Sequence, residues 1–234
     1  DNFTPLFESL KLPYPLPKLR EARKKYGITD SEWIAMRSNP GNKETSAKYK
    51  EYYEGDGAKL LTDKILNLVC FYIFGDNNNM KDLMMGIAEV ESCYGTNPST
   101  YKRSNFTQGM FQLDKASSLK TIGYKGVMIN GNENIKNRLN ACRNKVKQKL
   151  GLDWNSVPYD SIAKPLYSAI AARMYIESKL QSYDYDKSTN KITPKDHPIG
   201  NSRKQHASWW KKRYNTVAGA GTENKFLNPP GCSI

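Results

Sequence analysis

One stretch of the sequence, LMMGIAEVES at residues 83–92, combines an apolar helical face with two carboxylates. Leu83, Ile87 and Glu91 follow one another at i, i+4 and i+8, so they lie on one stripe of a helix. Glu91 therefore continues an apolar face, where desolvation disfavours its charged form and raises its pKa. Such a carboxyl holds a proton near neutral pH and suits a general acid. Glu89 projects from another side and is expected to be solvated or ion-paired.

Helical patterns extend on both sides of this stretch. Apolar residues recur at helical spacing over residues 58–74, and Asn77 to Asn79 offer N-caps for a helix over residues 80–92. Residues 101–113 alternate polar and aromatic side chains around Gly109, which favours a short hairpin or an irregular loop. The pattern predicts further helices over residues 18–26, 31–37 (capped by Asp30 or Ser31), 47–54, 115–121 (capped by Asp114), 133–150, 162–180 and 203–214, with turns at 151–158 and 184–200. The fold class is therefore mainly α.

The first part of the chain differs from the rest in composition. Pro13, Pro15 and Pro17 alternate with Leu and Tyr, which favours extended geometry ahead of the first helices. A Gly-Asp-Gly turn at residues 55–57 then precedes the apolar helical pattern. We predict an N-terminal helical and extended arm over residues 1–57 and a main domain over residues 58–234.

The composition indicates a folded globular protein. The 234 residues are 38% hydrophobic and 25% charged, with 15 tyrosines and a mean hydropathy of −0.73, so the chain is polar but too aromatic to be disordered. The longest apolar run, residues 65–74, is interrupted by Asn67 and is far below the roughly 20 residues of a membrane span. Residues 1–5 have neither a basic start nor an apolar run, so no secretory signal is expected.

The charge balance predicts an anionic partner. Lys and Arg number 36 and Asp and Glu 23, a net charge of +13, with an isoelectric point near 9.4. Nucleic acid, an acidic membrane surface and a cell-wall polymer all fit, and charge alone does not choose among them. The basic residues gather in two helical segments, either as solvated faces or as contacts to such a polymer: Lys136, Arg138, Arg143, Lys145, Lys147 and Lys149 in one, and Lys211, Lys212 and Arg213 in the other.

The four cysteines do not indicate a metal centre. Cys70, Cys93, Cys142 and Cys232 lie too far apart for a zinc knuckle, and the chain has two histidines. We expect no metal and no cofactor. One or two disulfides are compatible with this count, although Cys70 falls in an apolar helical pattern that favours a buried free thiol.

Periodicity alone favours a structural role for Glu91 at a helix end, and a resemblance reverses that choice. Three short motifs resemble, in order and spacing, the "ES", "GLMQ" and "YNaG" motifs of lytic transglycosylases and goose-type lysozymes. They are the pair Glu91-Ser92, the GMFQ at residues 109–112 and the YNTVAG at residues 214–219. The resemblance covers roughly residues 80–222. Two departures are that the serine before GLMQ is represented by Ser104 or Thr107, and that the glycine after Tyr-Asn is displaced to Gly219.

The resemblance implies an α+β lysozyme-like fold, a helical bundle around a catalytic helix with a short hairpin or loop beside the cleft. It implies cleavage of the β-1,4 bond between N-acetylmuramic acid and N-acetylglucosamine in peptidoglycan glycan strands. Glu91 would be the acid and then the base, Ser92 would support it, Tyr214 would orient the carboxyl, and Asn215 would bond substrate or backbone. The substrate contacts would come from Gly109, Met110, Phe111, Gln112, Tyr94, Trp209 and Trp210, with core positions for either tryptophan left open.

The acidic residues predict the type of chemistry. Hydrolysing glycosidases ordinarily use two carboxylates, but residues 95–112 contain no Asp or Glu, and Asp114 is the first acidic residue beyond them. We therefore expect a transglycosylase, with muramidase-type hydrolysis as the alternative. A virion-associated protein that degrades the cell wall, outside the cell or in the periplasm, fits the lack of a signal, with residues 1–57 docking on tail or core proteins. The rival readings are a basic nucleic-acid-binding protein and a structural virion protein with a degenerate lysozyme-like fold.

Overall fold

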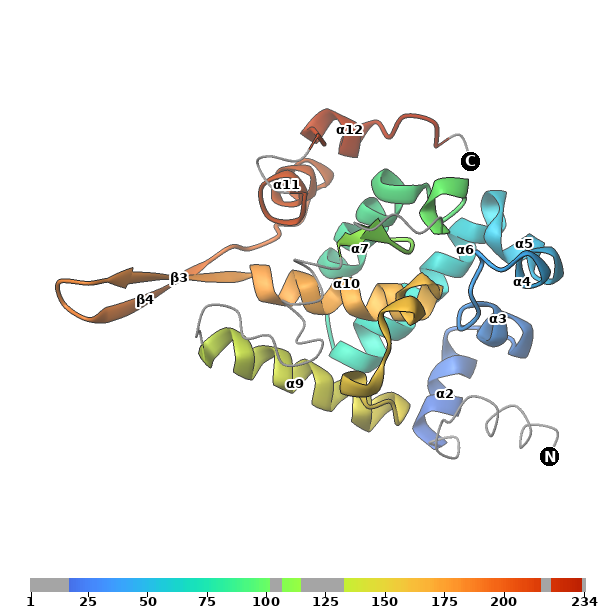
Figure 1. Ribbon diagram of the computed structural model, residues 1–234, viewed down its shortest axis with the longest axis horizontal. Coiled ribbons are helices and arrows are strands. Elements are labelled where there is room, and N and C mark those ends of the chain that lie inside the picture. Colours follow the sequence, from blue (N-terminus) through green and yellow to red (C-terminus); the bar gives the residue numbers. More distant parts are fainter. Residues whose placement is uncertain (1–16, 102–106, 115–132, 216–219, 233–234) are drawn as a thin grey trace.

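A computed structural model describes residues 17–101, 107–114, 133–215 and 220–232, and within these ranges the protein is mainly helical with two small antiparallel sheets (Figure 1). This confirms the mainly α prediction. The proline-rich residues 1–16 and the helix predicted over residues 115–121 lie outside the described residues. Among the helices that are described, none is long and apolar enough to cross a membrane.

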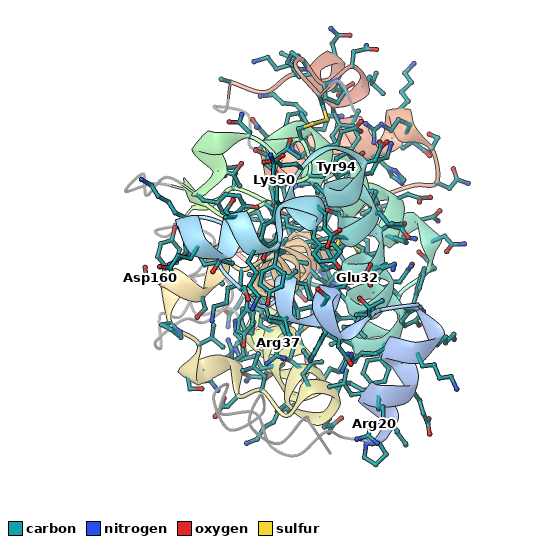
Figure 2. The ribbon with its side chains drawn as sticks, turned by 90° about the vertical axis from the view of Figure 1, so that its right-hand side faces the viewer. Arg20, Glu32, Arg37, Lys50, Tyr94 and Asp160 are labelled. Atoms are coloured by element: carbon teal, nitrogen blue, oxygen red, sulfur yellow. A yellow bond between two sulfur atoms is a disulfide. The ribbon has the colours of Figure 1, made fainter. Side chains whose placement is uncertain are left out.

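Between residues 17 and 53, where the description of the chain begins, the protein forms four short helices, α2 (Pro17–Lys25), α3 (Asp30–Ala35), α4 (Lys43–Lys48) and α5 (Lys50–Tyr53). Thr29, not Asp30 or Ser31, caps α3 in a capping box with Glu32. Glu32 also pairs with Lys64 at 2.7 Å, and Arg37 lies buried with its guanidinium over the ring of Trp33 (Figure 2). Buried residues of α2, α3 and α5 belong to one apolar core with the rest of the described chain, whereas α4 buries none. The domain boundary near residue 58 stays a prediction.

The centre of the protein is built from helices that bury at least one apolar face. Helix α6 (Gly55–Leu66) continues into the π-helix η1 (Asn67–Phe74), and α7 (Asn78–Ser92) follows with Asn77 as its N-cap. Helix α10 (Pro165–Lys179) contacts α6, η1 and α9 (Glu133–Leu150), and it runs through the middle of the molecule (Figure 1). Its sequence is apolar nearly all round, which is the pattern of a buried helix.

The two sheets are hairpins. Strands β1 (Thr107–Gln108) and β2 (Leu113–Asp114) pair beside the end of α7, as expected for residues 101–113. Strands β3 (Gln181–Asp186) and β4 (Lys191–Asp196) form a hairpin that projects from the body (Figure 1). The turn predicted over residues 184–200 was therefore wrong. Every residue of β4 is exposed, so this strand shows no alternation of buried and exposed residues.

The remaining described elements are short. The 3-10 helices η2 (Pro98–Tyr101), η4 (Trp154–Ser156) and η5 (Tyr159–Ala163) form connections. Helix α11 (Arg203–Trp209), the π-helix η6 (Trp210–Tyr214) and α12 (Glu223–Leu227) pack on α7 or on one another near the C-terminus. This C-terminal group brings Trp210 and Tyr214 to the end of α7 that carries Glu91.

A disulfide joins the end of α7 to the C-terminal segment. Cys93, the C-cap of α7, is bonded to Cys232 at a sequence separation of 139 residues (Figure 2). Cys70 and Cys142 are buried free thiols, as expected for Cys70. The bond restricts the unfolded chain over a long loop, which is a large entropic effect.

Removing this disulfide should lower stability without removing the fold. For Cys232→Ser we expect a loss of about 2–4 kcal/mol of unfolding free energy, because the unfolded chain regains the freedom of the long loop. The melting temperature of the parent, followed by circular dichroism, should fall on addition of dithiothreitol to that of the variant. The variant itself should not respond to dithiothreitol. Equal melting temperatures of the oxidised parent and the variant would contradict this expectation.

Candidate active site around Glu91

Glu91 lies in the last turn of α7, below the fully buried Leu83 and Ile87 of the same helical stripe. Its side chain is partly exposed, and its Oε1 accepts a hydrogen bond of 2.9 Å from the indole Nε1 of Trp210. Burial raises the pKa of Glu91 to about 7, although the indole donor acts in the opposite direction by stabilising the carboxylate. This carboxyl is therefore able both to give and to take a proton near neutral pH, as the sequence predicted.

Ser92 joins the end of α7 to the hairpin β1–β2. Its hydroxyl donates to the carbonyl of Met110 at 2.6 Å and accepts from the backbone N–H of Gly95 at 2.8 Å. The chain leaves the helix through Cys93 and Tyr94, both in the left-handed region at φ 49° and 58°. The supporting role expected for Ser92 thus has a physical form, because one hydroxyl fixes both the exit of the helix and the facing turn.

The turn of the β1–β2 hairpin is held close to α10. Gly109 has φ 79°, and a Cβ there would lie 2.4 Å from the carbonyl oxygen of Ile162 and 2.7 Å from Oγ of Ser168. Glycine is therefore required for the approach of the backbone. The Gln112 side-chain Nε2 donates to the carbonyl of Gly109 at 2.9 Å, and this bond closes the turn.

Tyr214 reaches this turn rather than the carboxyl. Its hydroxyl donates to the carbonyl of Phe111 at 2.8 Å, and its ring packs edge-on against Tyr175 with 5.1 Å between centroids. Burial and the nearby charge of Glu91 raise the pKa of Tyr214 well above its usual value, so the phenol stays protonated. The Tyr214 hydroxyl, which was expected to orient the Glu91 carboxyl, therefore donates to a backbone carbonyl instead. Asn215 bonds backbone, its Oδ1 accepting from Gly221 N–H at 3.3 Å.

Several residues expected to contact sugar rings belong to the core. Trp209 and Trp210 are 5% and 1% exposed. Of the two alternatives that the sequence left open for them, a core position is therefore correct. Tyr94, Met110 and Phe111 are also buried, so their side chains do not offer a surface to a glycan. These side chains lie in the apolar core because the hairpin and η6 pack directly on α7 and α10. What these segments contribute at the site is backbone carbonyls and one indole N–H.

Charged groups beside the site are paired. Glu89 Oε2 bonds Nη2 of Arg203 at 2.6 Å, which confirms the ion-paired alternative for Glu89. Arg203 also donates to the carbonyl of Phe226 at 2.8 Å. Sequence reasoning missed Arg203, since nothing in the local pattern of α11 indicates a partner on α7. No group of three or more potential metal ligands occurs within the residues that the structure describes.

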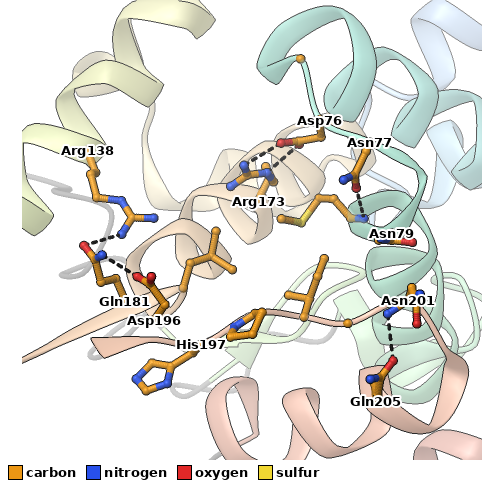
Figure 3. A pocket seen from close by; sticks show the side chains of 16 residues that line it. Asp76, Asn77, Asn79, Arg138, Arg173, Gln181, Asp196, His197, Asn201 and Gln205 are labelled. Atoms are coloured by element: carbon orange, nitrogen blue, oxygen red, sulfur yellow. Dashed lines mark hydrogen bonds and ion pairs between the residues drawn. The ribbon is translucent and has the colours of Figure 1, made fainter. Parts of the chain in front are cut away.

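A separate groove of about 1220 Å³ lies at the opposite end of α7 (Figure 3). Asn77, Asn79 and Met80 line it, and Glu91 does not, because α7 rises by roughly 1.5 Å per residue and carries Glu91 some 18 Å further on. One wall is an ion-pair network in which Arg173 bonds both oxygens of Asp76 at 2.7 Å. This network ties the connection between η1 and α7 to α10.

The basic helix α9 is largely engaged with its own protein. Arg138 pairs with Glu177 at 2.7 Å, Lys136 pairs with Glu133 at 3.3 Å, and Lys145 donates to the carbonyl of Phe74 at 2.9 Å. Lys147 is exposed. The run of positive charge therefore forms a surface that is partly neutralised, rather than a row of free cations.

Comparison of the chain with protein-family models, with characterised proteins and with solved structures gives no match.

Proposed function

We propose that this protein is a lytic transglycosylase with a lysozyme-like fold, which cleaves the bond between N-acetylmuramic acid and N-acetylglucosamine in peptidoglycan. The observation that carries the proposal is the joining of three distant motifs by two hydrogen bonds. Ser92 Oγ bonds the Met110 carbonyl, and Tyr214 Oη bonds the neighbouring Phe111 carbonyl. Glu91, with a pKa of about 7, lies beside this junction.

The chemistry requires one carboxyl that changes role. Glu91 protonates the glycosidic oxygen, so the bond to the anomeric carbon breaks and N-acetylglucosamine leaves with the proton. The resulting carboxylate removes the proton of the muramyl 6-hydroxyl, whose oxygen attacks the anomeric carbon and closes a 1,6-anhydro ring. Glu89, the other carboxylate of the helix end, is held by Arg203 and stays out of this sequence.

The product decides between transglycosylation and hydrolysis. We expect the digest of purified cell walls to contain 1,6-anhydromuramyl ends, because residues 95–112 supply no second carboxylate to activate water. Mass spectrometry separates these ends from reducing muramic acid, which is heavier by one water. Reducing ends as the main product would support the hydrolase alternative, and Asp114→Asn would then be the variant to test for loss of activity.

The proposed setting is a virion or the cell wall outside the cytoplasm, with residues 1–57 as the part that contacts other virion proteins. The rival function, binding of nucleic acid as a basic structural protein, is favoured by one observation. The basic helices α2 and α9 are in contact, which places their exposed lysines on neighbouring surfaces. The rival predicts salt-sensitive binding of DNA by a chain that releases no muropeptides from walls.

A further inference from the structure

We propose that Trp210 is a positioning residue for Glu91. Its indole N–H bonds Oε1 of the carboxyl, so that Oε2 carries the acid proton and faces the substrate. This inference rests on the proposed function of Glu91 as the acid. It gives Trp210 a task different from stacking on a sugar ring, which its burial prevents.

The choice of oxygen follows from the chemistry of the indole. An indole N–H donates and does not accept, so the oxygen that it contacts at 2.9 Å must act as an acceptor. In a neutral carboxylic acid the carbonyl oxygen is the better acceptor, and the proton therefore resides on the other oxygen. In the described part of the chain, Oε2 of Glu91 makes no hydrogen bond. It is the oxygen available to a glycosidic bond.

The indole is held in place on two sides. Its ring packs against Phe226 of α12 with 5.5 Å between ring centroids. A Cβ on Gly221 would lie 2.3 Å from Cη2 of Trp210, and one on Gly86 of α7 would lie 2.3 Å from Cζ of Phe226. The absence of a side chain at these two glycines thus allows the C-terminal segment to pack closely, with the indole in contact with the end of α7. A group locked in this way keeps its donor at one position, which a positioning role requires.

The same contact serves both steps of the proposed reaction. After proton transfer the carboxyl is negative, and the indole donor stabilises that charge through its hydrogen bond. In the part of the chain that the structure describes, Tyr214 of η6 lies close enough to feel the charge of Glu91 and stays neutral, while Glu89 and Arg203 neutralise each other. Within the described residues the indole is therefore the group that assists the ionised form of Glu91 through a hydrogen bond.

The first test replaces the donor and keeps an aromatic ring. Trp210→Phe should move the pKa of Glu91 upward, as followed by NMR of the carbon-13-labelled carboxyl, because the carboxylate loses its donor. The rate of wall lysis near pH 7 should fall roughly tenfold or more, and its decline at alkaline pH should move to higher pH. Trp209→Phe is the matched control, since its indole donates to the carbonyl of His197 at 2.9 Å and not to a carboxyl. The control should leave the Glu91 titration in place.

A second measurement needs no change at Trp210. The indole N–H resonance of Trp210 in the parent should shift with the same midpoint as Glu91, and this shift should vanish in Glu91→Gln, while the Trp209 resonance stays constant in both. A Trp210 resonance that ignores the ionisation of Glu91, or a Glu91 titration unchanged in folded Trp210→Phe, would overturn the inference. A parent that shows the coupled titration but releases no muropeptides would instead refute the proposed function.

Discussion

Glu91→Gln is expected to lower the rate of wall lysis roughly a thousandfold. The amide has nearly the shape of the carboxyl and can still accept from the Trp210 indole, but it cannot deliver a proton to the leaving oxygen. The measurement is the fall in turbidity of purified walls together with release of muropeptides. Glu89→Gln is the matched control two residues away, and it should retain most of the activity because its carboxylate serves an ion pair with Arg203.

The stability of this variant shows whether the loss is chemical. The pKa of Glu91 is about 7 in the folded protein and near 4.5 when unfolded. The unfolded chain therefore loses this proton first, so stability falls as pH rises from about 4.5 and the loss is complete above about pH 7. At pH 8, Glu91→Gln should therefore be more stable than the parent, on the order of 1–3 kcal/mol. An inactive variant that unfolds more easily at pH 8 would argue for a structural glutamate. Activity of the parent should decline as pH rises through about 7, since the acid must start protonated.

Asp76→Ala should destabilise the protein by about 3–5 kcal/mol. Asp76 binds Nε and Nη2 of Arg173, and the two side chains are 11% and 7% exposed, so the change leaves a buried guanidinium without one of its two carboxylate partners. Glu177 remains on Nη1 at 2.8 Å and limits the loss to the lower part of this range. Urea unfolding gives the free energy directly.

The control for this second prediction is an exposed pair of the same type. Lys50 and Glu54 lie 3.6 Å apart with side chains 67% and 61% exposed, so Glu54→Ala should change the unfolding free energy by less than about 1 kcal/mol. Equal effects of Asp76→Ala and Glu54→Ala on the unfolding free energy would mean that burial of the Asp76–Arg173 pair adds nothing to stability. Asp76→Asn should fall between the two, because the amide keeps one acceptor for Arg173 and loses the charge.

Local periodicity was sufficient for most helices and for the character of Glu91. The spacing of Leu83, Ile87 and Glu91 sets one face of α7 whatever packs against it, so both the helix and the raised pKa of the glutamate follow from the sequence. The residues around Gly109 predicted a short hairpin or an irregular loop, and the structure has the hairpin β1–β2. Local order in the chain carries this information because backbone hydrogen bonding and the burial of one face act over a few neighbouring residues.

Contacts between distant residues were decided by the tertiary structure alone. Trp210 meets Glu91 across 119 residues, Cys93 pairs with Cys232 across 139, and Asp76 meets Arg173 across 97. No local pattern favours one such partner over another. Strand β4 is exposed along its whole length and contains Pro194, a residue that argues against a strand in a sequence. The sequence by itself therefore determined which carboxyl continues the apolar face of the helix. The packing of α11, η6 and α12 on α7 determined which of its oxygens is held, because only the folded chain brings the indole donor within hydrogen-bonding distance.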